Sequence, residues 1–175
     1  MIRATLVPFA TTPCEAVRSL SATVTLLAGG KLRLHYSLDG RLADLRIPPE
    51  TTSERRDELW KHTCFEAFVA PAEGSAYREF NFAPSRDWAA YDFTEYRVNS
   101  GALPAAAPSI AVERDGDRLE VEAEFDLDFL PQAAGRLGLT AVIETRNGEL
   151  SYWALAHPAA RPDFHHADGF TLSFG

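Results

Sequence analysis

The side chains best suited to hold a polar ligand fall in four short segments that interrupt an otherwise regular sequence. These segments, 59–68, 77–91, 151–158 and 162–166, contain all three tryptophans and four of the five histidines. Sugars present both hydroxyl groups and apolar C–H faces, so their sites combine flat aromatic rings with acidic and amide side chains. A concave site of this kind needs only a few convergent polar groups. The segments therefore predict a site for a small polar ligand, with a sugar favoured.

The candidate site residues have aromatic, acidic, amide or imidazole side chains. We predict that the ligand is bound by Trp60, His62, Glu66, Glu79, Asn81, Trp88, Trp153, His157 and His165. In this prediction the tryptophans stack against the ligand, and the polar side chains orient its hydroxyl groups. Each charge-assisted hydrogen bond contributes about 1.5–3 kcal/mol. A structural alternative stays open, in which the tryptophans anchor the core and the histidines make structural hydrogen bonds.

Known catalytic and metal-binding motifs are absent from the sequence. It contains no Gly-x-Ser-x-Gly elbow, Walker-type loop, dinucleotide fingerprint or His-Glu-x-x-His motif. Its His, Asp and Glu residues also lack the spacing of a metal site. We therefore expect a binding protein that is not an enzyme and holds no metal. The alternative is a glycoside hydrolase that uses Glu66 and Glu79, whose carboxyl groups would then lie about 5–9.5 Å apart.

Composition argues against several other classes. The chain has 175 residues, with 17 Lys and Arg against 25 Asp and Glu, and a net charge of −8, whereas nucleic-acid binding requires clustered positive charge. No apolar run reaches the roughly 18 residues of a membrane span, and residues 1–6 lack the apolar core of a secretory signal. Cys14 and Cys64 are too few for a disulfide framework. We expect a cytoplasmic protein with a single domain over residues 1–175.

Alternating apolar and polar residues indicate that strands position the candidate side chains. Residues 32–38 and 119–125 alternate strictly, as strands with one buried face require. Turn sequences at 28–30, 115–116 and 147–148 predict three hairpins. Strands are expected at 3–9, 22–27, 31–38, 65–70, 77–82, 110–113, 118–125, 139–144, 150–156 and 170–174. We predict an all-β fold, a single antiparallel β-sandwich of jelly-roll type, with at most short helical turns at 52–60 and 128–134 and a crossing loop at 100–108.

The phase of the alternation assigns the candidate residues to faces of the sheets. Within 77–82 the two phenylalanines face the core, whereas Glu79 and Asn81 point the other way. On the preceding strand, Glu66 likewise lies opposite the core-facing residues. We expect these polar side chains to line one concave sheet face together with Trp153.

The same segments resemble a known family. Residues 59–66, 79–91, 151–158 and 162–165 are similar to bacterial DOMON-like domain proteins, which are relatives of the family 9 carbohydrate-binding modules. The resemblance spans most of the chain, from the first hairpin to the end. It implies a β-sandwich that binds sugar or haem without performing chemistry on it.

Haem is the alternative ligand that this resemblance implies. DOMON domains that bind haem commonly use a methionine as an axial ligand, but Met1 is the only methionine here. Haem would therefore need two histidines, for example His62 and His157. We accordingly expect no cofactor, with haem as the alternative. The expected assembly is a monomer or a weak homodimer, the latter pairing through an edge or face of the sandwich.

Overall fold

The computed structural model describes residues 1–102, 105–130 and 134–175. In these ranges the chain forms twelve strands and three short 3₁₀ turns, and neighbouring strands pair antiparallel. The elements are β1 (Ile2–Pro8), β2 (Val17–Leu27), β3 (Lys31–Gly40), η1 (Leu42–Asp44), η2 (Leu59–Lys61), β4 (Cys64–Pro71), β5 (Tyr77–Phe82), β6 (Trp88–Glu95), β7 (Val98–Ala102), β8 (Ser109–Asp115), β9 (Arg118–Asp126), β10 (Gly135–Glu144), β11 (Leu150–Ala154), η3 (Ala167–Gly169) and β12 (Leu172–Phe174). The predicted all-β fold is confirmed.

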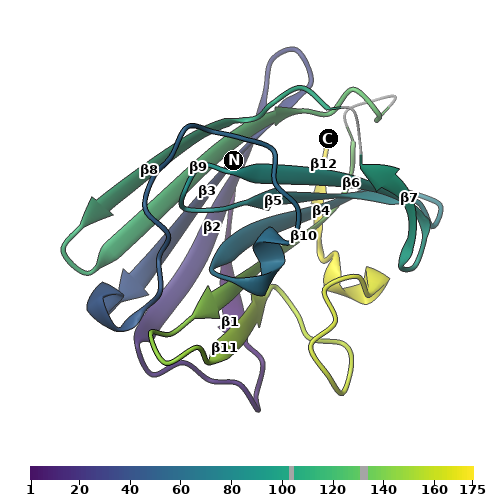
Figure 1. Cartoon of the computed structure of the whole chain (residues 1–175). Coiled ribbons are helices and arrows are strands. Elements are labelled where there is room, and N and C mark those ends of the chain that lie inside the picture. The colour runs from purple at the N-terminus through teal and green to yellow at the C-terminus, as the bar shows by residue number, and fades with distance from the viewer. Residues whose placement is uncertain (103–104, 131–133) are drawn as a thin grey trace.

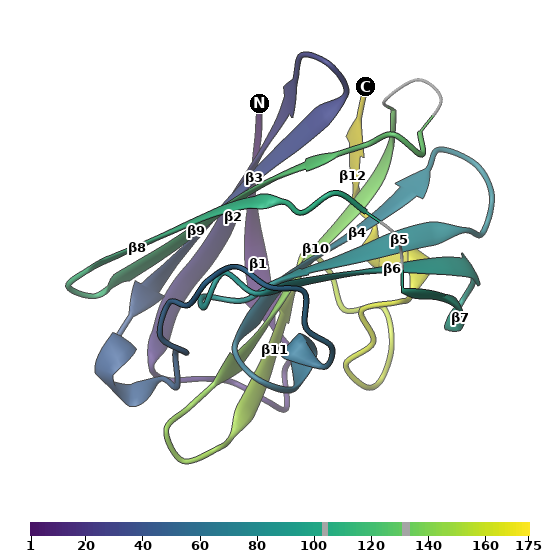
Figure 2. The same ribbon diagram turned by 45° about the horizontal axis from the view of Figure 1, so that its top comes forward.

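The strands form two layers that share β1. The first layer has the order β1-β2-β3-β9-β8, and the second has the order β7-β6-β5-β4-β10-β11, with β12 paired to β10. Residues 2–6 of β1 pair with β2, whereas Val7 and Pro8 pair with β11. The two layers are therefore joined along β1. Figures 1 and 2 show β8 at the far edge of one layer and β7 at the far edge of the other.

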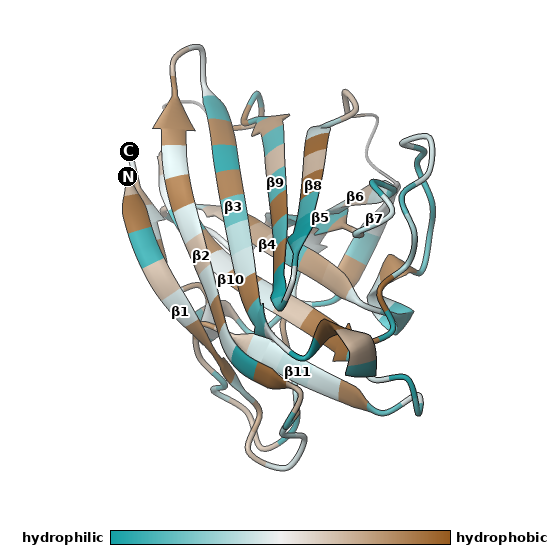
Figure 3. Cartoon of the chain, turned by 90° about the vertical axis from the view of Figure 1, so that its left-hand side faces the viewer, coloured by the Kyte–Doolittle hydropathy of each residue, from teal (hydrophilic) through white to brown (hydrophobic). Residues whose placement is uncertain are grey.

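Apolar side chains fill the space between the layers. Every second residue of β3 and β9 is buried, and Figure 3 shows the matching alternation of hydrophobic and hydrophilic residues along these strands. Tyr36 packs against Phe65 of the other layer with ring centroids 5.1 Å apart, and Phe80 packs against Phe125 at 4.3 Å. Full burial of one large apolar side chain contributes about 1.5–3 kcal/mol. This core explains why strands such as β3 and β9 each have one apolar face.

The three predicted hairpins are confirmed as β2–β3, β8–β9 and β10–β11. Two strands, β6 and β7, form where the sequence predicts none. The first half of β6 is buried on both faces, with Trp88 and Ala90 towards the other layer and Ala89 on the outside, so its apolar residues do not alternate with polar ones. The predicted crossing loop at 100–108 begins within β7, and residues 103 and 104 lie outside the described ranges.

The helical turn predicted at 52–60 is reduced to η2. Thr51 and Glu54 have the spacing of a capping box, in which the Thr51 hydroxyl would accept from the Glu54 backbone N–H. In the structure the Thr51 hydroxyl instead donates to the Ser85 carbonyl oxygen at 3.2 Å, and the Glu54 backbone N–H donates to the Asp87 carboxylate at 3.2 Å. The capping groups therefore attach this segment to the β5–β6 turn instead of starting a helix. Of the second predicted turn, at 128–134, residues 131–133 lie outside the described ranges.

Candidate functional site

The outer face of the second layer holds the acidic candidates side by side. Thr140, Glu66 and Asn81 are lateral neighbours on β10, β4 and β5, and paired residues of adjacent strands point to the same face. The alternate residues, such as Phe65, face the core. Glu79 lies two residues from Asn81 along β5 and shares its face. The predicted outward orientation of the three polar candidates is therefore confirmed.

The acidic cluster, formed by Cys64, Glu66, Glu79, Asn81 and Thr140, is almost fully buried. The Asn81 amide donates to Glu79 Oε1 at 2.8 Å, and the Cys64 thiol lies 3.7 Å from the Asn81 amide oxygen. The Thr140 hydroxyl donates to Glu66 Oε2 at 3.3 Å, but Glu66 Oε1 has no hydrogen-bond partner. Because buried polar atoms are normally paired, this oxygen is the clearest structural sign of a binding site.

Burial raises the pKa of both carboxyl groups in the acidic cluster. For Glu66 the loss of hydration is the largest cause, and the neighbouring Glu79 charge adds to it, so the pKa lies well above its ordinary value. The pKa of Glu79 is also raised by burial, against the opposing effects of the Asn81 hydrogen bond and the Arg97 charge. Within the described residues, the one basic side chain within 4 Å of either carboxyl group is His165, whose Nε2 lies 3.8 Å from Glu79 Oε2.

The Tyr77 hydroxyl lies next to His165. The Arg97 backbone N–H donates to the Tyr77 hydroxyl oxygen at 3.1 Å, and this oxygen lies 2.8 Å from His165 Nδ1. Burial, assisted by the positive charge of Arg97, lowers the pKa of His165 to about 4, so the ring is neutral at pH 7. In the tautomer with the ring proton on Nε2, the Tyr77 hydroxyl donates to Nδ1 and the ring presents an N–H donor on the side of Glu79.

The C-terminal cover, residues 157–171, lies against this outer face and is the yellow segment below β12 in Figure 1. Phe164 and Phe170 pack against Phe68 of β4 with ring centroids 6.5 and 5.8 Å apart. Asp163 accepts hydrogen bonds from Arg97 Nη2 at 2.8 Å and from the Tyr96 hydroxyl at 2.6 Å. These contacts fix His165 next to the acidic cluster.

Gly138 of β10 lies directly beneath the cover. A Cβ atom at this position would lie 2.5 Å from Phe170 Cδ1. Gly138→Ala is therefore expected to push Phe170 off the sheet and to lower the free energy of unfolding by about 1–3 kcal/mol, measured by urea denaturation. Gly169→Ala is the control, because its Cβ would meet only the Ala156 carbonyl oxygen, at 3.8 Å. Equal stability of the two variants would contradict the packing role of Phe170.

The loop wall, residues 46–63, also borders the outer face, where η2 contacts β4 and β5. Asp57 in this loop accepts a hydrogen bond from the Tyr91 hydroxyl of β6 at 2.8 Å. Trp60 in η2 is 45% exposed, and the Lys61 ammonium lies 5.5 Å from its ring centroid. An exposed indole near buried polar groups offers the flat apolar surface that a sugar ring can cover.

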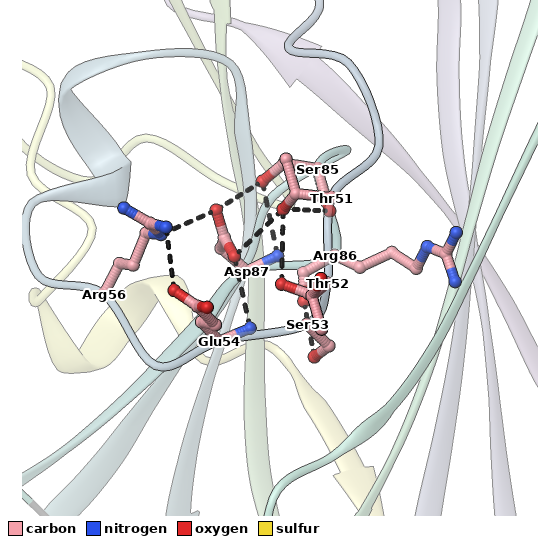
Figure 4. Close-up of polar contacts among 8 residues, drawn as sticks. All are labelled: Thr51, Thr52, Ser53, Glu54, Arg56, Ser85, Arg86 and Asp87. Atoms are coloured by element: carbon pink, nitrogen blue, oxygen red, sulfur yellow. Dashed lines mark hydrogen bonds and ion pairs between the residues drawn. The ribbon is translucent and has the colours of Figure 1, made fainter.

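Asp87 clamps the loop wall to the β5–β6 turn, as Figure 4 shows. Its buried carboxylate accepts hydrogen bonds from the Glu54 backbone N–H at 3.2 Å and the Ser85 hydroxyl at 2.9 Å, and Arg56 Nε lies 3.2 Å away. Two backbone hydrogen bonds reinforce it, from Trp88 N–H to the Glu54 carbonyl at 3.0 Å and from Arg56 N–H to the Trp88 carbonyl at 2.9 Å. The clamp fixes the segment that leads into η2.

The predicted site residues fall into three groups in the structure. Glu66, Glu79 and Asn81 belong to the acidic cluster, and His165 of the cover lies next to it. Trp60 and His62 lie in the loop wall. The remaining three predicted residues, Trp88, Trp153 and His157, are placed elsewhere.

Trp88 and Trp153 lie between the layers, so the prediction that they stack against a ligand on the acidic face is wrong. Trp153 pairs with Ala141 of β10 and Trp88 pairs with Phe82 of β5, and these neighbours face the core. The Trp153 indole N–H donates to the Ser151 hydroxyl at 2.9 Å, which satisfies it inside the core. Both faces of β11 carry apolar residues, so the alternation alone does not show which face is turned towards the core.

The two histidines considered for haem each have a local partner. His157 Nε2 lies 2.9 Å from the Val7 carbonyl oxygen, and its ring packs edge-on against Phe9. His62 Nδ1 lies 2.8 Å from Glu144 Oε2. Haem ligation by this pair stays a prediction. Within the described ranges, no three His, Cys, Asp or Glu side chains are grouped as a metal site requires.

Sequence reasoning did not include Thr140, Arg97 and Asp57 among the site residues. Thr140 meets Glu66 only through the pairing of β10 with β4, and Arg97 lies in the β6–β7 turn with a positive φ of 57°. The one sequence feature that could have identified these site residues is Thr140 itself, a polar residue within the apolar run 137–143. Turn and loop contacts such as that of Asp57 leave no periodic pattern in the sequence.

An open depression of about 580 Å³ lies at another part of the surface. Its lining includes Cys14, Arg41, Asp44, Arg146 and Glu149. Arg41 and Asp44 are exposed and form an ion pair at 2.7 Å; exposed pairs of this kind contribute little to binding or stability. No predicted site residue is among its lining residues, so the acidic cluster is the better candidate site.

No helix in the described ranges is long and apolar enough to cross a membrane.

Comparison with known proteins supports the fold. A solved structure of a protein from Bacteroides uniformis ATCC 8492, described as a candidate carbohydrate-binding protein, matches 97% of this chain and 84% of its own chain, with a TM-score of 0.66 and 15% identity. No family model and no curated protein matches the chain, so the resemblance to DOMON-like domains stays a prediction. At 15% identity, the likeness shows that the chain shares the fold of the Bacteroides protein.

Proposed function

We propose that this chain binds a small carbohydrate at the acidic cluster without changing it chemically. The observation that carries the proposal is the buried, unpaired Oε1 of Glu66, beside which Glu79 and Asn81 present further acceptor oxygens. A buried polar atom without a partner costs about 1–3 kcal/mol. A ligand hydroxyl that donates to Glu66 Oε1 would remove this cost, which makes binding favourable.

Two features favour a sugar over other polar ligands. Trp60 is exposed in the loop wall, and Tyr91 and Tyr152 are half-buried on the strands around the acidic cluster. Aromatic rings next to clustered acceptors match the apolar faces and the hydroxyl groups of a sugar. The Bacteroides protein with the same fold is also described as a candidate carbohydrate-binding protein.

Glycoside hydrolysis by Glu66 and Glu79 stays the alternative prediction. Such an enzyme needs one protonated acid and one ionised nucleophile or base, and burial here raises the pKa of both carboxyl groups.

Access to the acidic cluster depends on the cover. Glu66 and Asn81 are only 2% and 0% exposed, and His165 of the cover lies close to Glu79. A ligand therefore reaches these side chains only as the cover or the loop wall shifts. The association rate constant is accordingly expected to lie below about 10⁵ M⁻¹s⁻¹, the lower end of the range that is usual for proteins that bind without a conformational change.

Titration calorimetry with a panel of neutral mono- and disaccharides tests this function. Asn81→Ala is expected to weaken binding at least about tenfold, because the amide both holds Glu79 and faces the ligand. Asn99→Ala is the matched control, because the one hydrogen bond of the Asn99 side chain within the described residues is accepted from the Gly101 backbone N–H at the exposed β7 edge. Absence of binding to any sugar by the unmodified protein would overturn the proposal.

A further inference from the structure

We infer that the bound sugar carries a protonated amine, which contacts the carboxyl groups of Glu66 and Glu79 and displaces a proton from them. This inference rests on the carbohydrate-binding function proposed above and narrows its ligand class. It is drawn from the imbalance between acceptors and donors in the acidic cluster.

Acceptor atoms outnumber donors in the acidic cluster. Glu66 Oε1 is unpaired, Glu79 Oε2 has only His165 Nε2 at 3.8 Å, and the Asn81 amide oxygen has only the weak thiol contact at 3.7 Å. Of the donors, the Thr140 hydroxyl bonds to Glu66 and one of the two Asn81 amide N–H groups bonds to Glu79. A ligand that fits must therefore bring several donors. An ammonium group has three and no acceptor.

The charges around the pair compensate it only in part. Within the described residues, the titratable side chains that surround it are Tyr36 on β3, Cys64 on β4, Tyr77 on β5, Tyr91 on β6, Asp57 in the loop wall, Arg97 in the β6–β7 turn, and Asp163 and His165 in the cover. Arg97 is the one permanent cation in this group; its charge lowers the pKa of Glu79, but it is already paired with Asp163 at 2.8 Å. His165 is neutral at pH 7. Apart from this shared charge of Arg97, the two carboxyl groups lack a compensating positive charge.

A proton and an ammonium group compete for the same place. The Glu66 and Glu79 carboxyl groups are both buried and repel each other when ionised, so ionising both has a large cost in free energy. In the free protein, binding a proton to the pair lowers this cost. A ligand ammonium supplies the same positive charge and forms charge-assisted hydrogen bonds, which are roughly twice as strong as neutral ones. When it binds, the proton leaves to solvent as the carboxylate forms. A neutral sugar cannot replace the proton in this way.

Calorimetry with three sets of three sugars tests the inference. Glucosamine, galactosamine and mannosamine are each compared with the parent hexose and with the neutral N-acetyl derivative, at about pH 6, where a primary amine stays protonated. We expect at least one amine to bind about tenfold or more tightly than its neutral partners. The measured heat of that amine should differ between phosphate and Bis-Tris buffers in proportion to the protons released, whereas neutral sugars should give the same heat in both.

Charge-neutral variants separate the role of the carboxyl pair from packing. Glu66→Gln and Glu79→Gln keep the side-chain shape, and each is expected to bring the affinity ratio of amine to neutral sugar close to one and to abolish the buffer dependence. Glu120→Gln, on the outer face of the first layer, is the control and should preserve the ratio.

Each outcome of the comparison is decisive. If neutral sugars bind as tightly as the amines, or no protons are released, the inferred ligand class is wrong while the proposed carbohydrate function stands. If no sugar binds, the proposed function fails and the inference fails with it.

Discussion

Glu66→Gln is expected to be more stable than the unmodified protein at pH 8, by about 1–3 kcal/mol. The buried Glu66 carboxyl group has a raised pKa, chiefly because burial removes its hydration. The folded state therefore holds the proton more tightly than the unfolded state, in which the pKa is about 4.3. Stability from this group falls as the pH rises from the unfolded value towards the folded one. Glutamine carries no charge at any pH and removes this loss.

Urea unfolding between about pH 7.5 and 8.5 measures the effect, because His165 contributes its own pH dependence around and below its unfolded pKa of about 6.5. The pKa of His165 is lowered to about 4 in the folded state, so its contribution is lost as the pH falls through the unfolded value and is nearly constant above about pH 7.5. The unmodified protein should lose stability as the pH rises, and Glu66→Gln should lose clearly less.

Glu79→Gln separates the two causes of the raised pKa. It removes the neighbouring charge but leaves Glu66 buried, so we expect a partial flattening of the pH dependence and non-additive effects in the double variant. Glu120→Gln, on the solvated outer face of the first layer, should leave the slope unchanged. If Glu66→Gln follows the pH dependence of the unmodified protein, Glu66 does not bear the raised pKa and the electrostatic account of the acidic cluster is wrong.

Asp87→Ala is expected to lower the free energy of unfolding by about 2–4 kcal/mol and to loosen the loop wall. The substitution leaves the buried Ser85 hydroxyl and the Glu54 backbone N–H without their acceptor, and it removes the ion pair with Arg56. Because Arg55 and Arg56 lie in the clamped segment, the variant should be cut faster by trypsin at these residues. Mass spectrometry of the first cleavage products measures this directly.

Two further variants check the account of the clamp. Asp87→Asn keeps an acceptor oxygen but loses the charge, so its stability should lie between that of Asp87→Ala and the unmodified protein. Asp128→Ala removes an exposed carboxylate that is also paired with an arginine, at 3.0 Å, and should cost only about 0–1 kcal/mol. If Asp87→Ala and Asp128→Ala lose equal stability and are cut by trypsin at equal rates, Asp87 is not a clamp.

Local features of the sequence were sufficient for the strands that have one wet face. In β3 and β9 core-facing residues alternate with solvent-facing ones, so both the position and the orientation of these strands could be predicted. Of β2 only residues 22–27 were predicted, and of β8 only residues 110–113. The same reasoning placed Glu66, Glu79 and Asn81 opposite the core. It did not find β6, because a strand buried on both faces carries apolar residues without alternation.

Tertiary structure decided which side chains share the site. Alternation separates the residues of β11 into two sets, but only the packing of the second layer against the first showed that Trp153 belongs to the inner one. Glu66 and Thr140 are 74 residues apart and meet through the register of β4 and β10, and His165 reaches Glu79 because the cover packs on Phe68. The sequence by itself determined most of the strands, though not β6 and β7, together with the three hairpins and the polar character of one face. Which side chains contact that face depended on the long-range register of the strands and on loop packing. Both arise from the whole core and leave no periodic signal in any one segment.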